Sequence, residues 1–232
     1  MKVLVIAAHP DDEVLGVGGT IAKHVESKDE VYVCILGEGI TSRELSLKKK
    51  SQKEKNHKIK KLKNNALEAS KILGIKKILF FGLPDQKFDT LPILDIIKKI
   101  EKCVKEIKPD IVYTHSETDL NRDHRIVFEA SMVATRPLGN GIKKILSYEV
   151  PSSTEWGSPV SKKHFIPNVF INIEKTLEKK LKAMKKYKSE IRDFPHPRST
   201  EALKALAKKH GVEVGLKSAE AFVLIREINP NR

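Results

Sequence analysis

Short apolar runs alternate along the chain with segments in which apolar residues recur every three or four positions. The first run, residues 3–8, is apolar at every position, which is typical of a central parallel strand covered on both faces. We predict further strands at 31–36, 78–81, 110–114, 145–150, 169–173 and 221–225. Helical spacing predicts helices at 13–26, 59–73, 91–107, 126–134 and 174–191. This alternation predicts an α/β fold: a Rossmann-like, doubly wound, mainly parallel sheet in a three-layer α/β/α arrangement.

The 232 residues contain no internal repeat and no low-complexity linker, so we expect one domain over residues 1–232. Hydrophobic residues make up 40% of the chain, a fraction that excludes collagen-like and disordered proteins. The longest surface loops are expected at 37–51 and 151–167.

The two cysteines, Cys34 and Cys103, both lie in apolar stretches. This placement argues against a disulfide framework and against a cysteine zinc site, and it favours a reducing compartment. No apolar run approaches the roughly 18 residues that a membrane helix needs, and the run 3–8 is too short for a signal peptide. We therefore expect a cytoplasmic protein without a membrane span.

The formal net charge of +14 is concentrated in the segment 48–63, which holds nine lysines and one acid, Glu54. This segment supports one alternative function, a basic protein that binds nucleic acid or another anionic surface. It contains no aromatic residue on which bases could stack, so we favour a solvated helix face and expect no nucleic-acid partner.

The first candidate site follows the first predicted strand, at the edge of the sheet where doubly wound proteins bind ligands. His9 and Asp12 stand three positions apart there and can converge on one cation. The neighbouring acids Asp11 and Asp12 would repel a pyrophosphate. We therefore predict that the glycines in the segment 16–19 serve close helix packing, not nucleotide binding.

A second polar cluster follows the fourth predicted strand: His115, Ser116, Asp119, Asn121, Asp123, His124 and Arg125. A doubly wound sheet would bring the two clusters side by side. A catalytic zinc needs three nitrogen or oxygen ligands and an open position, and His124 is the best candidate for the third ligand. The same ligand types would also accept ferrous iron.

These residues resemble the PIG-L/LmbE-like de-N-acetylases, zinc hydrolases that remove acetyl groups from N-acetylglucosamine-type sugars. The opening motif of that family is similar to His9-Pro10-Asp11-Asp12-Glu13, and its second motif to Asp119-x-Asn121-x-Asp123-His124. The similarity extends through residues 82–85 and 219–222 and so spans nearly the whole chain.

The resemblance implies that His9, Asp12 and His124 hold Zn²⁺ and that Asp11 is the general base for the metal-bound water. Zinc lowers the pKa of such a water to about 7, and a neighbouring carboxylate can then take its proton. The implied substrate is a small N-acetylated amino sugar, such as a GlcNAc-type conjugate, a glycolipid or a nucleotide sugar.

In a common form of the family, a histidine lies three positions before the last zinc ligand. This chain departs from that form, because it has Asn121 at the corresponding position. An asparagine amide can donate a hydrogen bond to an oxyanion but cannot protonate the leaving amine. The proton must then come from protonated Asp11 or from His196. Asp123 either orients a ligating imidazole or caps the following helix.

Three further residues are candidates for binding sugar hydroxyls or a phosphate: Glu38, Arg43 and Arg198. Each of them could equally be a surface residue. The sequence identifies neither the sugar nor the oligomeric state, and a homo-oligomer is compatible with it.

Overall fold

The computed structural model describes residues 1–41, 52–157 and 164–229. Its strands are β1 (Lys2–Ala7), β2 (Glu30–Gly37), β3 (Lys77–Leu83), β4 (Ile111–His115), β5 (Lys144–Tyr148), β6 (Val169–Asn172) and β7 (Ala219–Glu227). Its helices are α1 (Asp12–Glu26), α2 (Gln52–Leu73), α3 (Ile93–Ile107), α4 (Arg122–Ala134), α5 (Leu177–Met184) and α6 (Thr200–Val212). Two short 3₁₀ helices lie at Phe88–Thr90 and Thr154–Trp156.

The strands form one sheet in the order β3-β2-β1-β4-β5-β7-β6. The first five strands of this order are parallel, and β7 runs antiparallel to both of its neighbours, β5 and β6. The predicted mainly parallel sheet is therefore confirmed, with an antiparallel strand toward one edge.

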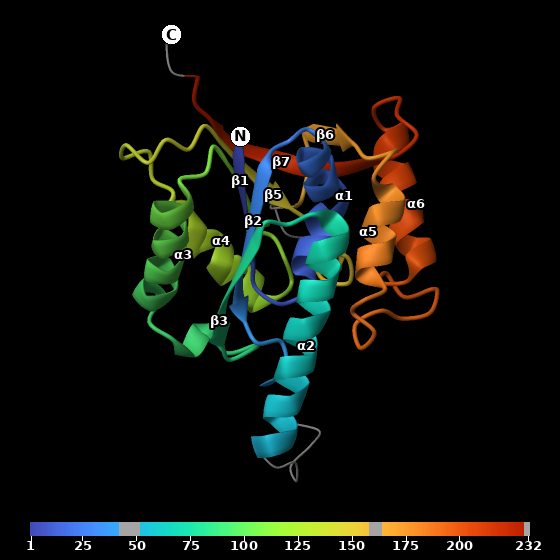
Figure 1. The fold of residues 1–232 in the computed structure, drawn as a ribbon. Coiled ribbons are helices and arrows are strands. Elements are labelled where there is room, and N and C mark those ends of the chain that lie inside the picture. Colours follow the sequence, from blue (N-terminus) through green and yellow to red (C-terminus); the bar gives the residue numbers. More distant parts are fainter. Residues whose placement is uncertain (42–51, 158–163, 230–232) are drawn as a thin grey trace.

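Helices cover both faces of the sheet (Figure 1). One core packs α1, α2 and α5 against the sheet, and the other packs α3 and α4 against its opposite face. Figure 1 shows α3 and α4 to the left of the sheet and α1, α2, α5 and α6 to the right. The three-layer α/β/α arrangement is confirmed, because each buried strand is covered on both sides, as its continuous apolar sequence requires.

The region after β6 differs from the prediction. The helix expected over 174–191 ends at Met184, and the chain then turns so that Tyr187 is buried with its hydroxyl donating to Glu13. The helix α6 was not predicted. Its sequence signal is Ser199, the residue before the helix, whose hydroxyl accepts the N–H of Ala202 at 3.0 Å.

The glycines of α1 allow a close approach of neighbouring elements, as predicted. A Cβ atom at Gly16 would lie 2.2 Å from the ring of Tyr148, and one at Gly19 would lie 2.9 Å from Ile173. Any larger side chain at Gly16 would push α1 away from β5. The close packing fixes the start of α1, where the candidate ligands lie.

The surface also matches the expectation of a solvated basic helix. None of the lysines of α2 is buried, whereas its residues Leu62, Ala66, Ala69 and Leu73 face the core. The lysines at 48–50 lie outside the described residues. Across the described ranges, no helix is both long enough and apolar enough to cross a membrane. Cys34 and Cys103 are buried free thiols.

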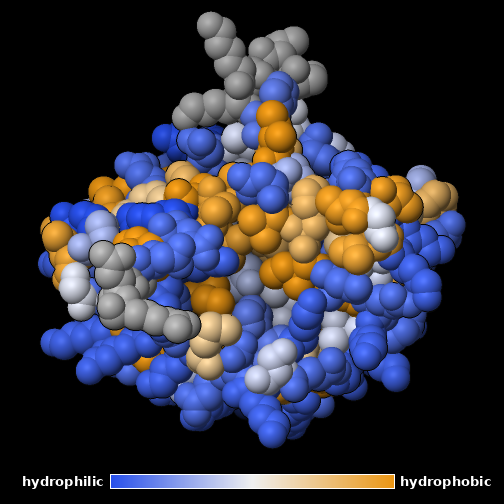
Figure 2. Space-filling view, turned by 90° about the horizontal axis from the view of Figure 1, so that it is seen from above, coloured by the Kyte–Doolittle hydropathy of each residue, from blue (hydrophilic) through white to orange (hydrophobic). Residues whose placement is uncertain are grey.

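The candidate chemistry lies at the end of the sheet opposite the two chain termini. Seen from above, from the end at which both termini lie, hydrophobic residues form a band across the middle of a hydrophilic outline (Figure 2). The parallel strands begin at this end. Their carboxyl ends, where the sequence places the candidate chemistry, lie at the opposite end of the sheet.

Candidate active site

The candidate site lies between the carboxyl ends of β1 and β4, which are adjacent and parallel. The chain leaves β1 for α1 on one face of the sheet and leaves β4 for α4 on the other face. This divergence opens a crevice at the strand ends, which is where open α/β sheets bind ligands. His9 follows β1, Asp12 begins α1, and His124 lies in the first turn of α4.

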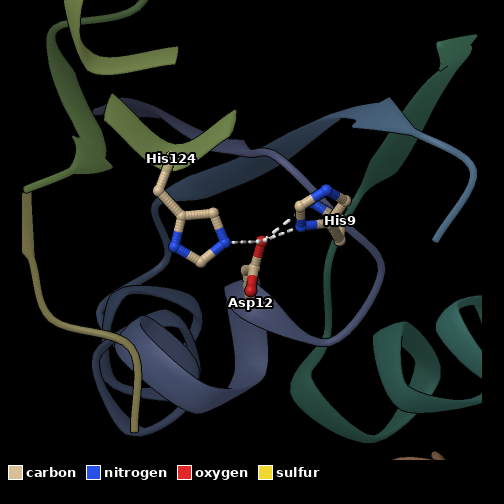
Figure 3. A group of neighbouring side chains, drawn as sticks. All are labelled: His9, Asp12 and His124. Atoms are coloured by element: carbon tan, nitrogen blue, oxygen red, sulfur yellow. Dashed lines mark hydrogen bonds and ion pairs between the residues drawn. The ribbon is translucent and has the colours of Figure 1, made fainter. Parts of the chain in front are cut away.

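The structure brings the three predicted ligands together (Figure 3). Asp12 Oδ2 lies 3.6 Å from His9 Nδ1 and 3.4 Å from His124 Nε2. One ligand atom from each residue lies within 4.8 Å of the other two, and all three side chains are buried. The two sequence clusters, more than a hundred positions apart, therefore meet at one point.

The donor set fits a tetrahedral metal ion. Ligand atoms bonded to zinc at 2.0–2.1 Å stand about 3.4 Å apart at the corners of a tetrahedron, close to the separations of Asp12 Oδ2 from His9 Nδ1 and His124 Nε2. His124 Nε2 is buried and makes no hydrogen bond within the described part of the chain. The carboxylates of Asp12 and Asp119 overcome the effect of burial and raise the pKa of His124 to about 9, so these surroundings favour a positive charge.

Three further carboxylates contact the imidazoles on the side away from Asp12: those of Asp85 and Asp123 at His9, and that of Asp119 at His124. Asp123 Oδ2 accepts a hydrogen bond from His9 Nε2 at 2.9 Å, which leaves His9 Nδ1 to face Asp12. On the other side, Asp119 Oδ2 lies 3.1 Å from His124 Nδ1. Carboxylates in this position fix the tautomer and the orientation of ligating histidines.

The structure decides between the two roles predicted for Asp123, which are orienting an imidazole and capping α4. The cap of α4 is Asn121, whose Oδ1 accepts the N–H of Asp123 at 2.9 Å. The Asp123 carboxylate instead contacts His9 and accepts the N–H groups of Gln86 and Phe88. Asp123 therefore orients an imidazole and anchors the loop after β3.

Asp11 is held beside the candidate ligands in an unusual conformation. Its φ of 118° is one that residues with a side chain rarely adopt. Its N–H donates to Glu13 Oε2 at 3.0 Å, and the hydroxyl of Tyr187 donates to the other oxygen of Glu13. Burial raises the pKa of the Asp11 carboxyl well above its usual range, against the opposing effect of Arg198 at 3.0 Å. A carboxylate with a raised pKa is suited to accept and return a proton near neutral pH.

A polar pocket of about 150 Å³ opens over these residues. Its lining includes His9, Asp11, Asp12, Asp85, Asn121, His124, Ser152, Ser153, Glu190 and Arg198. Because Oδ1 of Asn121 is engaged in the helix cap, its amide N–H groups are what this side chain can offer to a ligand. Arg198 reaches both Asp11 at 3.0 Å and Glu190 at 3.3 Å.

The remaining predicted residues lie elsewhere. The Glu38 carboxylate accepts the N–H groups of Ile40 at 2.8 Å and Thr41 at 3.1 Å, so it organises the loop after β2. Arg43 lies outside the described residues. His196 does not line the pocket but stands next to it, with Nδ1 accepting the N–H of Arg198 at 3.1 Å. Burial and the charge of Arg198 lower the pKa of His196.

Sequence reasoning assigned no role to several residues of this site. Asp119 accepts the hydroxyl groups of Ser153 and Thr154, and the charge of His124 opposes the effect of burial and holds the pKa of Asp119 at about 2. Asp119 is a member of the second predicted cluster, and Ser153 follows the end of β5, where the same rule could have located it. Glu190 carries no local signal, because only the tertiary fold brings it to Arg198.

Comparison with known proteins identifies the family. The sequence pattern of the GlcNAc-PI de-N-acetylase (PIG-L) family matches residues 4–135. The chain belongs to the PIG-L family. The uncharacterized deacetylase YaiS of Escherichia coli is 32% identical over 193 residues, covering 81% of this chain and 90% of YaiS. The diacetylchitobiose deacetylase of Thermococcus kodakarensis is 26% identical, covering 95% of this chain and 82% of that enzyme.

A solved structure extends the likeness to the whole fold. GalB, the 4-carboxy-2-hydroxymuconate hydratase of Pseudomonas putida KT2440, superposes with a TM-score of 0.77 at 20% identity and covers 100% of this chain and 98% of GalB. Likeness at this level of identity concerns the fold alone. PIG-L family enzymes are metal-dependent de-N-acetylases, so this protein is a hydrolase of that class.

The PIG-L match and the site overlap only in part. The matched residues 4–135 include His9, Asp12 and His124 together with the three carboxylates that contact the two imidazoles. Ser152, Glu190 and Arg198, which complete the pocket, lie beyond this span. The three candidate metal ligands therefore lie within the matched span, whereas these three pocket residues lie after it.

Proposed function

We propose that this protein is a zinc-dependent hydrolase that removes the N-acetyl group from an N-acetylated amino sugar of the GlcNAc type. The observation that carries the proposal is the meeting of His9 Nδ1, Asp12 Oδ2 and His124 Nε2 beneath a polar pocket that Asp11 also lines. The activity named for the Thermococcus relative supports an N-acetylated sugar as the substrate.

Zinc bound by these three residues would supply a Lewis acid that polarises the amide carbonyl and lowers the pKa of a coordinated water. Asp11 accepts a proton from the attacking water, since its carboxyl is buried beside the ligands and its pKa is raised. The amide N–H of Asn121 donates a hydrogen bond to the carbonyl oxygen as negative charge develops there.

The leaving amine takes its proton from Asp11. Asp11 lines the pocket, and the raised pKa of its carboxyl favours the protonated form that it reaches after the attack. His196 is the weaker candidate, because it does not line the pocket and its lowered pKa favours the neutral imidazole. Replacing His196 by Gln is expected to leave kcat and its pH profile intact.

Arg198 is our candidate for orienting the substrate. It lines the pocket and faces Asp11, so a sugar hydroxyl or an anionic substituent can reach it. The identity of the conjugate, whether glycolipid, nucleotide sugar or oligosaccharide, is set by groups outside this small pocket.

The test combines metal analysis with acetate release. The purified protein should carry about one zinc per chain, and Asp12→Ala should lose it because one of three ligands is gone. Asp11→Asn should keep the metal while kcat falls about 10²- to 10⁴-fold, the usual contribution of a general base. Release of acetate from a panel of N-acetyl sugars is the readout, with zinc and ferrous iron compared anaerobically.

Two outcomes would refute the proposal. One is acetate release that survives complete removal of metal. The other is hydration of an unsaturated dicarboxylate without any acetate release from the sugars, since the fold also supports a hydratase in GalB.

A further inference from the structure

Trp156 is the single tryptophan of the chain, and its side chain is 52% exposed. It ends the short helix Thr154–Trp156, and the residues just before this helix, Ser152 and Ser153, line the pocket. Tryptophan is enriched at binding interfaces, because its indole offers a large apolar face together with one polar N–H group. The exposed indole is therefore a candidate contact for a ligand that extends beyond the pocket.

The turn that carries Trp156 is fixed to the candidate metal site. The hydroxyl groups of Ser153 and Thr154 both donate to Asp119, and Asp119 faces His124 Nδ1 at 3.1 Å. These bonds tie the turn to a residue that orients a ligating histidine. The indole ring consequently has a defined place relative to the reacting centre.

His196 and Arg198 connect Trp156 to the pocket. The rings of His196 and Trp156 form a T-shaped pair, with centroids 6.1 Å apart and planes at 82°. The N–H of Arg198 donates to His196 Nδ1 at 3.1 Å, and Arg198 Nε donates to Ser152 Oγ at 2.6 Å. Arg198 lines the pocket itself, so a continuous series of contacts runs from Trp156 to the site.

The volume of the pocket limits how much of a substrate it can enclose. Its volume of about 150 Å³ is well below the roughly 300–1,000 Å³ of sites that enclose a whole small-molecule ligand. The pocket can enclose the part of the substrate that reacts, and the remainder of a larger substrate must rest on the rim.

We propose that Trp156 is a stacking platform for a second sugar ring, joined to the N-acetylated ring that the pocket holds. This inference rests on the proposed function and narrows it to glycosides of at least two rings. A sugar ring presents a face of C–H groups and an edge of hydroxyl groups. The indole face packs against the C–H face of the second ring. His196, Arg198 and Ser152 offer hydrogen-bonding groups to its hydroxyl edge.

The decisive experiment compares a disaccharide with a monosaccharide. For N,N′-diacetylchitobiose and N-acetylglucosamine, the ratio of the two kcat/KM values is measured in wild type and in Trp156→Ala. Loss of one aromatic stacking contact should lower this ratio about five- to tenfold, through a higher KM for the disaccharide. Trp156→Phe should restore most of the ratio, because it returns an aromatic face.

A matched control removes another exposed apolar side chain. Leu138, between α4 and β5, is 78% exposed, and the start of β5 lies at the end of the sheet away from the site. Leu138→Ala should leave the ratio at the wild-type value. An unchanged ratio in Trp156→Ala overturns the inference. A larger loss for a phenyl glycoside of N-acetylglucosamine than for the disaccharide also overturns it, since the occupant would then be an aromatic aglycone.

Fluorescence separates failure of this inference from failure of the proposed function. Because Trp156 is the only tryptophan, its emission reports contact with a ligand directly. In zinc-loaded Asp11→Asn, N,N′-diacetylchitobiose should change the emission more than N-acetylglucosamine does. No change at concentrations where calorimetry detects bound disaccharide, or no binding of disaccharide at all, overturns the platform. Absence of acetate release by wild type from every N-acetyl sugar overturns the function instead.

Discussion

Charged side chains gather in two regions of this molecule that differ in their exposure to water. At the crevice between β1 and β4, Asp12 is buried within 3.4–3.6 Å of three histidine rings, those of His9, His115 and His124. On α2, none of the lysines is buried. Buried charges lose their hydration and need fixed partners, whereas water and salt screen exposed ones. The buried charges are therefore the ones to which we assign the proposed chemistry, and the formal net charge of +14 is mainly a property of the surface.

Two adjacent lysines of α5 give this comparison its strongest test. Lys180 is buried and donates to Glu220 at 2.6 Å and to the carbonyl of Leu15 at 2.8 Å. Lys180→Ala leaves the Glu220 carboxylate buried without its cation, so we expect a loss of about 3–5 kcal/mol in the free energy of unfolding. Urea denaturation measures this loss directly.

Lys179 provides the matched control for that substitution. It pairs with Glu26 at 2.7 Å, but both side chains are more than 40% exposed. Lys179→Ala should change the free energy of unfolding by no more than about 1 kcal/mol, because exposed ion pairs contribute little. Equal losses in the free energy of unfolding for Lys180→Ala and Lys179→Ala would contradict the expectation that burial makes an ion pair more important for stability.

The second test changes a carboxylate outside the proposed set of metal ligands. Asp123→Asn keeps the size of the side chain but weakens the acceptor for His9 Nε2, which lies 2.9 Å away. We expect the affinity for zinc to fall about 10- to 100-fold, as is usual when a carboxylate behind a ligating histidine is lost. Competition with a chelator measures the affinity, and a melting curve of the metal-free variant shows whether the fold is retained. Zinc affinity equal to that of wild type in a folded variant would contradict the role given to Asp123.

The parts of the structure that the sequence predicts are those with a local signal. Each predicted strand lies within a few residues of an observed one. For the buried parallel strands the reason is that such a strand needs a continuous apolar run. The meeting of His9 with His124 also follows from the sequence, since both come after strands that a doubly wound sheet places side by side.

The parts that escaped prediction depend on contacts between distant segments. Arg198 meets Asp11 and Glu190 only after the chain turns beyond α5, and no spacing in the sequence encodes that turn. Glu38 follows β2 as a substrate-binding group would, yet its carboxylate is engaged by the backbone of its own loop. A polar residue after a strand end thus indicates the right edge of the sheet without distinguishing a ligand-binding group from a loop anchor.

We expect the smallest effect on stability from substitutions of the exposed lysines of α2. Lys53, Lys60 and Lys61 of α2 are exposed, and glutamine has a helix propensity close to that of lysine. Replacing all three by Gln should change the free energy of unfolding by no more than about 0.5 kcal/mol per position and leave kcat unchanged. The same variant tests the alternative that this surface binds nucleic acid. Salt-dependent binding of wild type to duplex DNA, with a slope of log K against log salt that drops by about 0.9 for each lysine removed, would favour that alternative. Absence of such binding would leave the lysines of α2 as a solvated helix face, as the sequence predicts.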